Sequence, residues 1–106
     1  MNKDPIDVFD NWALIGRDEL MAKGHAVSVK EMLKLAITGK KKFSFLDVGC
    51  GNGWVVRKMA KYNKCSFAAG VDGSVHMIAK AKSVDEIGNY FCQDIRQWMP
   101  EMTFDI

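Results

Sequence analysis

A glycine-rich segment lies between a short apolar run and a helical pattern near the middle of the chain. The apolar run covers residues 43–48, the sequence GCGNG covers residues 49–53, and apolar residues recur near one helical face over residues 54–62. Glycines that follow a strand and open a helix let the backbone approach a ligand closely, because they carry no side chain. The segment therefore predicts a strand, a turn and a helix, in this order. The turn either binds a ligand or is a tight structural bend.

Further short apolar runs follow at residues 66–72 and 89–92, and another begins at residues 104–106. Ser74 can cap a helix between the first two of these runs. Strands that alternate with helices are typical of a parallel sheet. We therefore predict an α/β fold, a three-layer α/β/α sandwich with a parallel sheet, whose fourth strand begins at residue 104. The first strand should have the next two on one side of it, and right-handed crossovers should place helices on both faces.

The chain before the glycine-rich segment carries helical patterns with caps. Asp4 can cap a helix that Pro5 opens and that ends near Gly16. Asp18 can cap a second, short helix that Gly24 ends. These residues predict a helical segment that is interrupted at each glycine.

A third helix is predicted from a capping box, in which Ser28 and Glu31 satisfy each other's backbone amides. Gly39 supplies the stop at its other end. The pattern changes to strands after the lysines at positions 40 to 42. We therefore divide the chain into a helical lead-in or lid, residues 1–42, and part of a ligand-binding domain, residues 43–106.

Composition restricts the class of protein. The chain has 106 residues, with 48 % hydrophobic and 26 % charged residues, which suits one soluble globular domain. It has no apolar run of the ~20 residues that a membrane span needs and no signal-peptide pattern at its start, so a cytoplasmic location without a membrane partner is expected. A net charge of +2 does not indicate a nucleic-acid partner. The three cysteines lack metal-ligand spacing, so we expect reduced thiols and no metal site.

Asp72 ends the second predicted strand, 23 residues after Gly49 (72 − 49). An acidic side chain about 20 residues beyond a glycine-rich turn can accept hydrogen bonds from both hydroxyls of a ribose. An N-cap or surface role is the alternative for this aspartate. Trp54 stands where a dinucleotide-binding turn has glycine or alanine, which counts against a pyrophosphate ligand.

The segment FLDVGCGNGW resembles motif I of the class I, Rossmann-like methyltransferases that depend on S-adenosylmethionine. The resemblance implies that S-adenosylmethionine is the cofactor and that residues 43–106 form part of the N-terminal half of such a domain. It also implies that the α/β/α sandwich is Rossmann-like and that its sheet is truncated at the start of the fourth strand. In that family the acidic residue of the motif, Asp47 here, fixes the turn and orients the amino group of the cofactor. The backbone of the turn lies against the methionine part, and the residues concerned are Gly49, Cys50, Gly51, Asn52 and Gly53.

Two later segments are similar to the same family. In GVDGSVHMI, the resemblance implies that Asp72 binds the ribose. Gly73 stands where a bulky apolar residue often packs on adenine, so Met77 is the nearer candidate for that contact, with a place in the helix core as the alternative. In FCQDIRQW, Asp94 would accept from the adenine amino group and the Ile95 amide would donate to the ring. Asp94 could instead cap the turn that follows it.

The helical lead-in offers two further candidates if it covers the cofactor, as in several small-molecule methyltransferases. Arg17 would then meet the methionine carboxylate and His25 would face the substrate, whereas a solvated arginine and an ordinary loop histidine are the alternatives. The implied function is methyl transfer to an unidentified small-molecule acceptor, with no catalytic residue identified. A nucleotide- or NAD-binding Rossmann protein and a non-catalytic S-adenosylmethionine-binding module are the competing interpretations. The chain alone is expected to have little activity and to self-associate.

Overall fold

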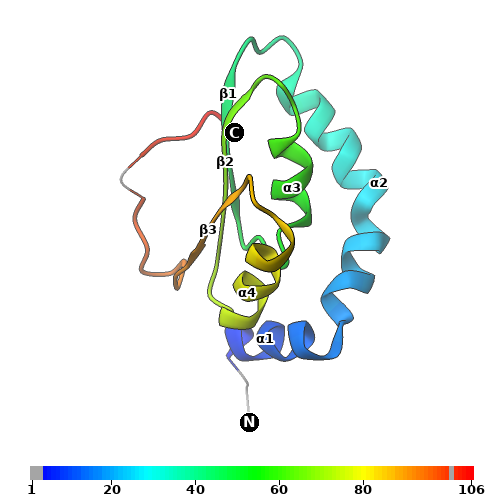
Figure 1. Ribbon diagram of the computed structural model, residues 1–106, viewed down its shortest axis with the longest axis vertical. Helices are drawn as coiled ribbons and strands as arrows, with labels where there is room; N and C mark the ends of the chain where they lie inside the picture. The colour runs from blue at the N-terminus through cyan, green and yellow to red at the C-terminus, as the bar shows by residue number, and fades with distance from the viewer. Residues whose placement is uncertain (1–3, 101) are drawn as a thin grey trace.

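The computed structural model of the protein describes residues 4–100 and 102–106. Helices and strands alternate after two leading helices (Figure 1). Their order is α1 Pro5–Ile15, α2 Arg17–Ile37, β1 Phe43–Val48, α3 Trp54–Ala60, β2 Cys65–Asp72, α4 Val75–Val84 and β3 Asn89–Cys92. None of the helices in this part of the chain is both long enough and apolar enough to cross a membrane.

The three strands form a parallel sheet in the order β1-β2-β3. Residues 104–106 are not a strand, but Ile106 pairs with the free side of β1. The Ile106 amide donates to the Ser44 carbonyl at 3.1 Å, and the Leu46 amide donates to the Ile106 carbonyl at 3.1 Å. This is the hydrogen-bond pattern of a parallel pair. The prediction of a parallel sheet with the second and third strands on one side of the first is therefore confirmed.

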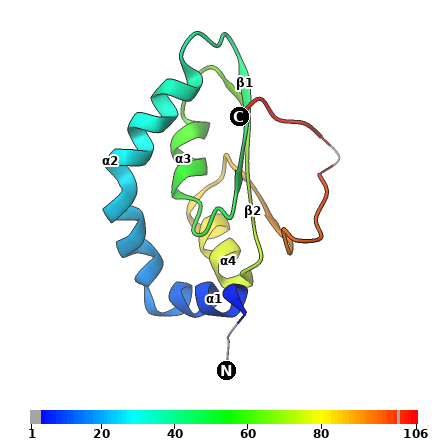
Figure 2. The same cartoon turned by 180° about the vertical axis from the view of Figure 1, so that it is seen from behind.

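Both crossover helices lie on one face of the sheet. Figures 1 and 2 show α3 and α4 on the same side, with α2 outside them, whereas residues 93–106 cross the opposite side. There Phe104 packs near Phe67, and Trp98 stacks on Phe91. The expectation of helices on both faces is not met in the described residues. The crossovers from β1 to β2 and from β2 to β3 are both right-handed and run in the same direction across the sheet, so they place α3 and α4 on the same face. The connection after β3 runs back to the other side of β1, so it crosses the opposite face.

A single hydrophobic core fills the space between the sheet and its helices. Alternate residues of each strand point to this side, and the helices contribute one apolar face each. Leu33 ties α2 to the same core. The buried residues of the cluster are Leu33, Phe43, Phe45, Cys50, Val56, Met59, Ala68, Ile78, Ala81 and Tyr90.

The predicted breaks in the lead-in are only partly correct. Asp4 caps α1 by accepting from the Ile6 amide at 2.9 Å, and Gly16 ends it in the left-handed conformation, with φ 78°. In contrast, α2 continues through both Gly24 and Ser28, so the predicted stop and the capping box are wrong. A glycine inside a helix costs only about 1 kcal/mol, which the neighbouring helix formers offset.

Candidate functional site

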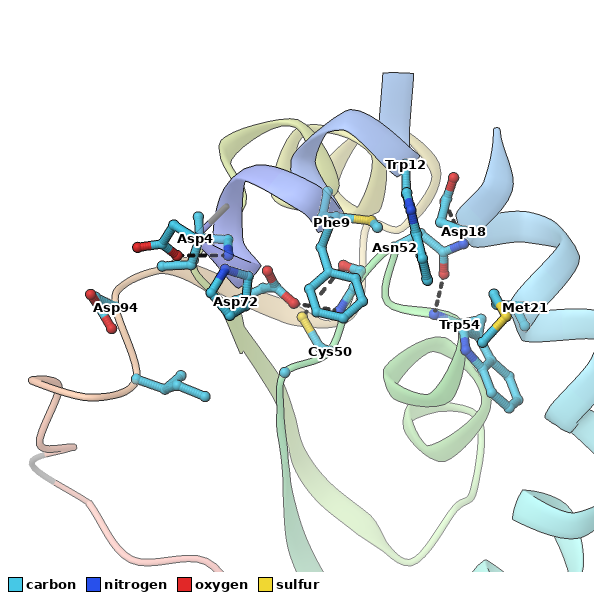
Figure 3. Close-up of a pocket in the computed structure, with 18 of the residues that line it drawn as sticks. Asp4, Phe9, Trp12, Asp18, Met21, Cys50, Asn52, Trp54, Asp72 and Asp94 are labelled. Atoms are coloured by element: carbon cyan, nitrogen blue, oxygen red, sulfur yellow. Dashed lines mark hydrogen bonds between the residues drawn. The ribbon is translucent and has the colours of Figure 1, made fainter. Parts of the chain in front are cut away.

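A cavity of about 480 Å³ lies at the carboxyl ends of the three strands. Its walls come from the glycine-rich turn after β1, the segments that follow β2 and β3, and the facing sides of α1 and α2. Figure 3 shows Asp4, Asp72 and Asp94 toward one end of the cavity and Trp54 and Met21 toward the other. Ligands of open α/β sheets bind at this edge, so the cavity is the candidate site.

The glycine-rich turn forms the floor of the cavity from residue 49 to residue 52. Gly51 has φ 55°, and its neighbouring space is open except for the Met77 sulfur, 3.9 Å from where a Cβ would stand. Gly53 differs from the rest of the turn, because it does not line the cavity. A Cβ there would lie 2.6 Å from Cε1 of Tyr90, so Gly53 allows α3 to pack against β3. The absence of a side chain at Gly53 thus permits a close contact with Tyr90 of the same chain, and not with the cavity.

Asp72 joins the turn after β1 to the start of α4. Its Oδ2 accepts from the Gly51 amide at 2.9 Å, and its Oδ1 accepts from the Ser74 amide at 2.9 Å. Each oxygen of a carboxylate can accept two hydrogen bonds, and each oxygen of Asp72 accepts one here. Each can therefore accept one more hydrogen bond, from a ligand. Asp72 lines the cavity, as a ribose-binding residue must.

Asp47 and Cys50 lie next to Asp72 and respond to its charge. Burial, and then the charge of Asp72, raise the pKa of Asp47 to about 6. Burial also raises the pKa of the Cys50 thiol, which therefore stays protonated. Cys50 lines the cavity, whereas Asp47 is not among the lining residues. The predicted contact of Asp47 with an amino group stays a prediction.

The space beside Gly73 is filled by α1. A Cβ at Gly73 would lie 2.6 Å from Cδ1 of Ile6, and both residues line the cavity. Ile6 thus supplies the apolar group that the sequence lacks after Asp72. Met77 is buried, with 3 % of its surface exposed, and also lines the cavity. Met77 is therefore a buried residue of the cavity wall, and its contact with adenine stays a prediction.

Asp94 has its carboxylate paired with Arg96. Arg96 Nε lies 2.9 Å from Oδ1, and Nη2 lies 2.7 Å from Oδ2 and 3.3 Å from Oδ2 of Asp4. The hydrogen bonds from Arg96 lower the pKa of Asp94. The Asp94 carbonyl also accepts from the Gln97 amide. Asp94 therefore caps a turn and, together with Ile95, lines the cavity.

Asp18 was expected to begin a helix, but it lies inside α2 and is buried. Its Oδ2 accepts from Asn52 Nδ2 at 2.8 Å, and its Oδ1 accepts from Lys80 Nζ at 3.0 Å. Asn52 Oδ1 in turn accepts from the Trp54 amide at 3.2 Å. The glycine-rich turn is thus held from α2 and α4. No local sequence signal indicated this triad, because its members are far apart along the chain.

The two lead-in candidates are placed differently. Arg17 is not among the lining residues; its guanidinium lies 4.9 Å from the ring centroid of Trp12, which does line the cavity. Phe9 meets the Trp12 ring edge-on at 5.0 Å. His25 lines the cavity. The aromatic pair on α1 was not singled out in the sequence, because apolar residues at helical spacing indicate a core face equally well.

The fold and the cavity define a Rossmann-like domain with a ligand site at the carboxyl edge of a parallel sheet. Residues 45–106, more than half of the chain, match the family described as a methyltransferase domain. The chain belongs to this family.

Known relatives resemble the chain over most of its length. It is 26 % identical over 110 residues to a malonyl-[acyl-carrier protein] O-methyltransferase from Bacillus anthracis, across 100 % of this chain and 41 % of the relative. It therefore spans about two fifths of the length of this curated relative. A DhpI–SAH complex is similar in fold, with a TM-score of 0.73, 19 % identity and coverage of 93 % of this chain and 48 % of that one. The plantazolicin methyltransferase BpumL in complex with an analog and SAH has a TM-score of 0.68 and 22 % identity, with 89 % and 41 % covered.

Proposed function

We propose that this chain binds S-adenosylmethionine as part of an enzyme that transfers the methyl group to a small-molecule acceptor. One observation carries the proposal: the glycine-rich turn, Asp72 and Asp94 lie at or just beyond the carboxyl ends of successive strands and line the same cavity. Membership of the methyltransferase domain family supports it, and so do the SAH complexes among the similar structures.

The residues of the cavity fit the parts of this cofactor in chain order. Residues 49–52 would lie against the methionine part, Asp72 would accept from the ribose hydroxyls, and Asp94 and the Ile95 amide would meet the adenine edge. Ile6, together with Met77, offers apolar surface for the adenine ring.

The charge of the cavity wall favours a cationic ligand over a pyrophosphate. Asp4, Asp18, Asp72 and Asp94 line it. Lys80 pairs with Asp18, and Arg96 pairs with Asp4 and Asp94, so Asp72 is the lining aspartate that has no ion pair among the described residues. Carboxylates attract a sulfonium and repel phosphates. The wall therefore supports S-adenosylmethionine and counts against NAD.

The cofactor supplies an electrophilic methyl group on sulfur, so the protein has to align a nucleophile with it and exclude water. In this chain α1 would cover the site, with Phe9 and Trp12 as apolar groups that keep water out. Trp54 and Met21 would line the side from which an acceptor approaches (Figure 3). The 106-residue chain by itself is expected to bind the cofactor with little turnover.

Calorimetry of the full-length protein with S-adenosylmethionine, S-adenosylhomocysteine and NAD tests the binding part of the proposal. We expect binding of the first two ligands and none of NAD. Transfer of radiolabelled methyl to a panel of small acceptors tests the reaction. Preferential NAD binding would contradict the proposal, and cofactor binding without transfer to any acceptor would favour a non-catalytic module.

A further inference from the structure

Asp10 on α1 accepts hydrogen bonds from the first turn of α4. Its Oδ1 accepts from Ser74 Oγ and from the His76 amide at 2.9 Å, and its Oδ2 lies 2.6 Å from His76 Nδ1. The first turn of a helix presents unsatisfied amides and a partial positive charge, which a carboxylate stabilises. The hydrogen bond from Ser74 lowers the pKa of Asp10, so this carboxylate is ionised at neutral pH.

Ser74 connects this contact to the cavity. It is fully buried, its hydroxyl donates to Asp10, and its amide donates to Oδ1 of Asp72 at 2.9 Å. Asp72 accepts from the Gly51 amide through its other oxygen. A continuous path of hydrogen bonds therefore runs from α1 through Ser74 and Asp72 to the glycine-rich turn.

We propose that Asp10 is a positioning residue for cofactor binding, which acts through Ser74 on the carboxylate of Asp72. The inference rests on the proposed function, in which Asp72 holds the ribose. Asp10 does not line the cavity, so it acts without touching the ligand. Without Asp10, the Ser74 hydroxyl and the His76 amide lose their common acceptor, so the start of α4, which includes the amide that holds Asp72, is less firmly held.

The affinity of the full-length protein for S-adenosylmethionine, measured by calorimetry, tests the role of Asp10. We expect Asp10→Ala to raise the Kd about tenfold, because the start of α4 then holds the Asp72 carboxylate less firmly in its binding position. Asp10→Asn should retain most of the affinity, because its amide oxygen still accepts from Ser74. The matched control is Asp7→Ala on the same helix, because the Asp7 side chain is exposed and makes no hydrogen bond or ion pair within residues 4–100 and 102–106. Its Kd should stay within about twofold of the wild type.

A second variant interrupts the same path at its middle. Ser74→Ala leaves the sequence of α1 unchanged, and it also removes the side-chain cap that Ser74 gives to the Met77 amide. It should raise the Kd about tenfold as well, so it tests the proposal if Asp10→Ala does not fold. If Asp10 acts through Ser74, adding Asp10→Ala to Ser74→Ala should change the Kd by less than about twofold.

Two results would overturn the inference while wild-type binding is intact. One is unchanged affinity in both single variants, and the other is a double variant whose losses multiply, as independent contacts do. Wild-type protein that binds no S-adenosylmethionine would instead overturn the proposed function itself.

Discussion

The Gly51 amide donates a hydrogen bond of 2.9 Å to Oδ2 of Asp72. Gly51 follows β1 and Asp72 ends β2, and these neighbouring strands are paired up to Val48 and Val71. Both line the cavity. Because this bond fixes the carboxylate relative to the turn, substitutions at either residue should disturb the same ligand site.

Asp72→Ala should weaken the binding of S-adenosylmethionine by roughly 1–3 kcal/mol, because ribose hydroxyls are left without an acceptor in a partly buried site. The amides of Gly51 and Ser74 also lose their acceptor. Asp72→Asn keeps one acceptor oxygen and should lose less. Calorimetry on folded protein measures both, and unchanged affinity in Asp72→Ala would remove Asp72 from the site.

Gly51→Val should weaken cofactor binding more than Asp72→Ala. Its side chain would enter the cavity, and its φ of 55° is unfavourable for a β-branched residue. Gly39→Val is the matched control, since Gly39 has φ 80° and open space around it, but lies in a surface turn away from the cavity. The control should lose stability in urea unfolding and keep its affinity. Equal losses of affinity in both variants would mean that backbone strain at a positive φ, and not a side chain in the cavity, causes the loss.

Gly73→Ala should destabilise the protein by about 1–3 kcal/mol, because the added methyl group overlaps Ile6. Ile6→Ala removes the obstructing atoms, so the double variant should be more stable than the sum of the single effects predicts. Urea unfolding of the wild type, both single variants and the double variant measures the coupling. If the changes in the free energy of unfolding are additive, Ile6 does not lie against residue 73 in solution, and the prediction is wrong.

Local signals in the sequence predicted most of the elements. The strand ranges 43–48 and 89–92 agree with β1 and β3, and the caps at Asp4 and Ser74 are present. Each depends on residues within one turn or one strand. The prediction that Gly24 ends a helix is wrong, because a single glycine weakens a helix without ending it when the residues on both sides favour helix.

The contacts that shape the site could not be predicted in the same way. Asp18 reaches Asn52 across 34 positions and Lys80 across 62. Ile6 fills the space beside Gly73 only because α1 docks on α4. These pairs depend on how the lead-in packs against the sheet, and one sequence carries no period or spacing that encodes such packing.

Asp47→Asn should stabilise the protein at pH 7. The folded-state pKa of Asp47 is raised to about 6, above its usual 3.8, so the folded protein holds this proton more tightly than the unfolded chain. The stability contribution is complete below about pH 4 and falls as the pH rises through about 6. The difference between Asn variant and wild type should therefore grow from near zero at pH 4 to about 2–3 kcal/mol at pH 7. Urea unfolding at both values measures it, and a constant difference would contradict the assignment.

The 106-residue chain should self-associate when it is produced alone. Leu20, Val27 and Leu35 on α2 expose 70 %, 77 % and 79 % of their surfaces, and apolar groups of this kind favour association. Replacing the three with glutamine keeps the helix propensity and should shift the mass toward 11.9 kDa in light scattering. A wild-type chain that is already monomeric would contradict this prediction.

Helix α2 is continuous from Arg17 to Ile37 and connects the cavity to the core. Its 21 residues span about 30 Å. Asp18 and Met21 stand at the cavity near one end, and Leu33 is set into the core near the other. Because α2 is one continuous helix, the packing of Leu33 in the core helps to set where Asp18 and Met21 stand at the cavity.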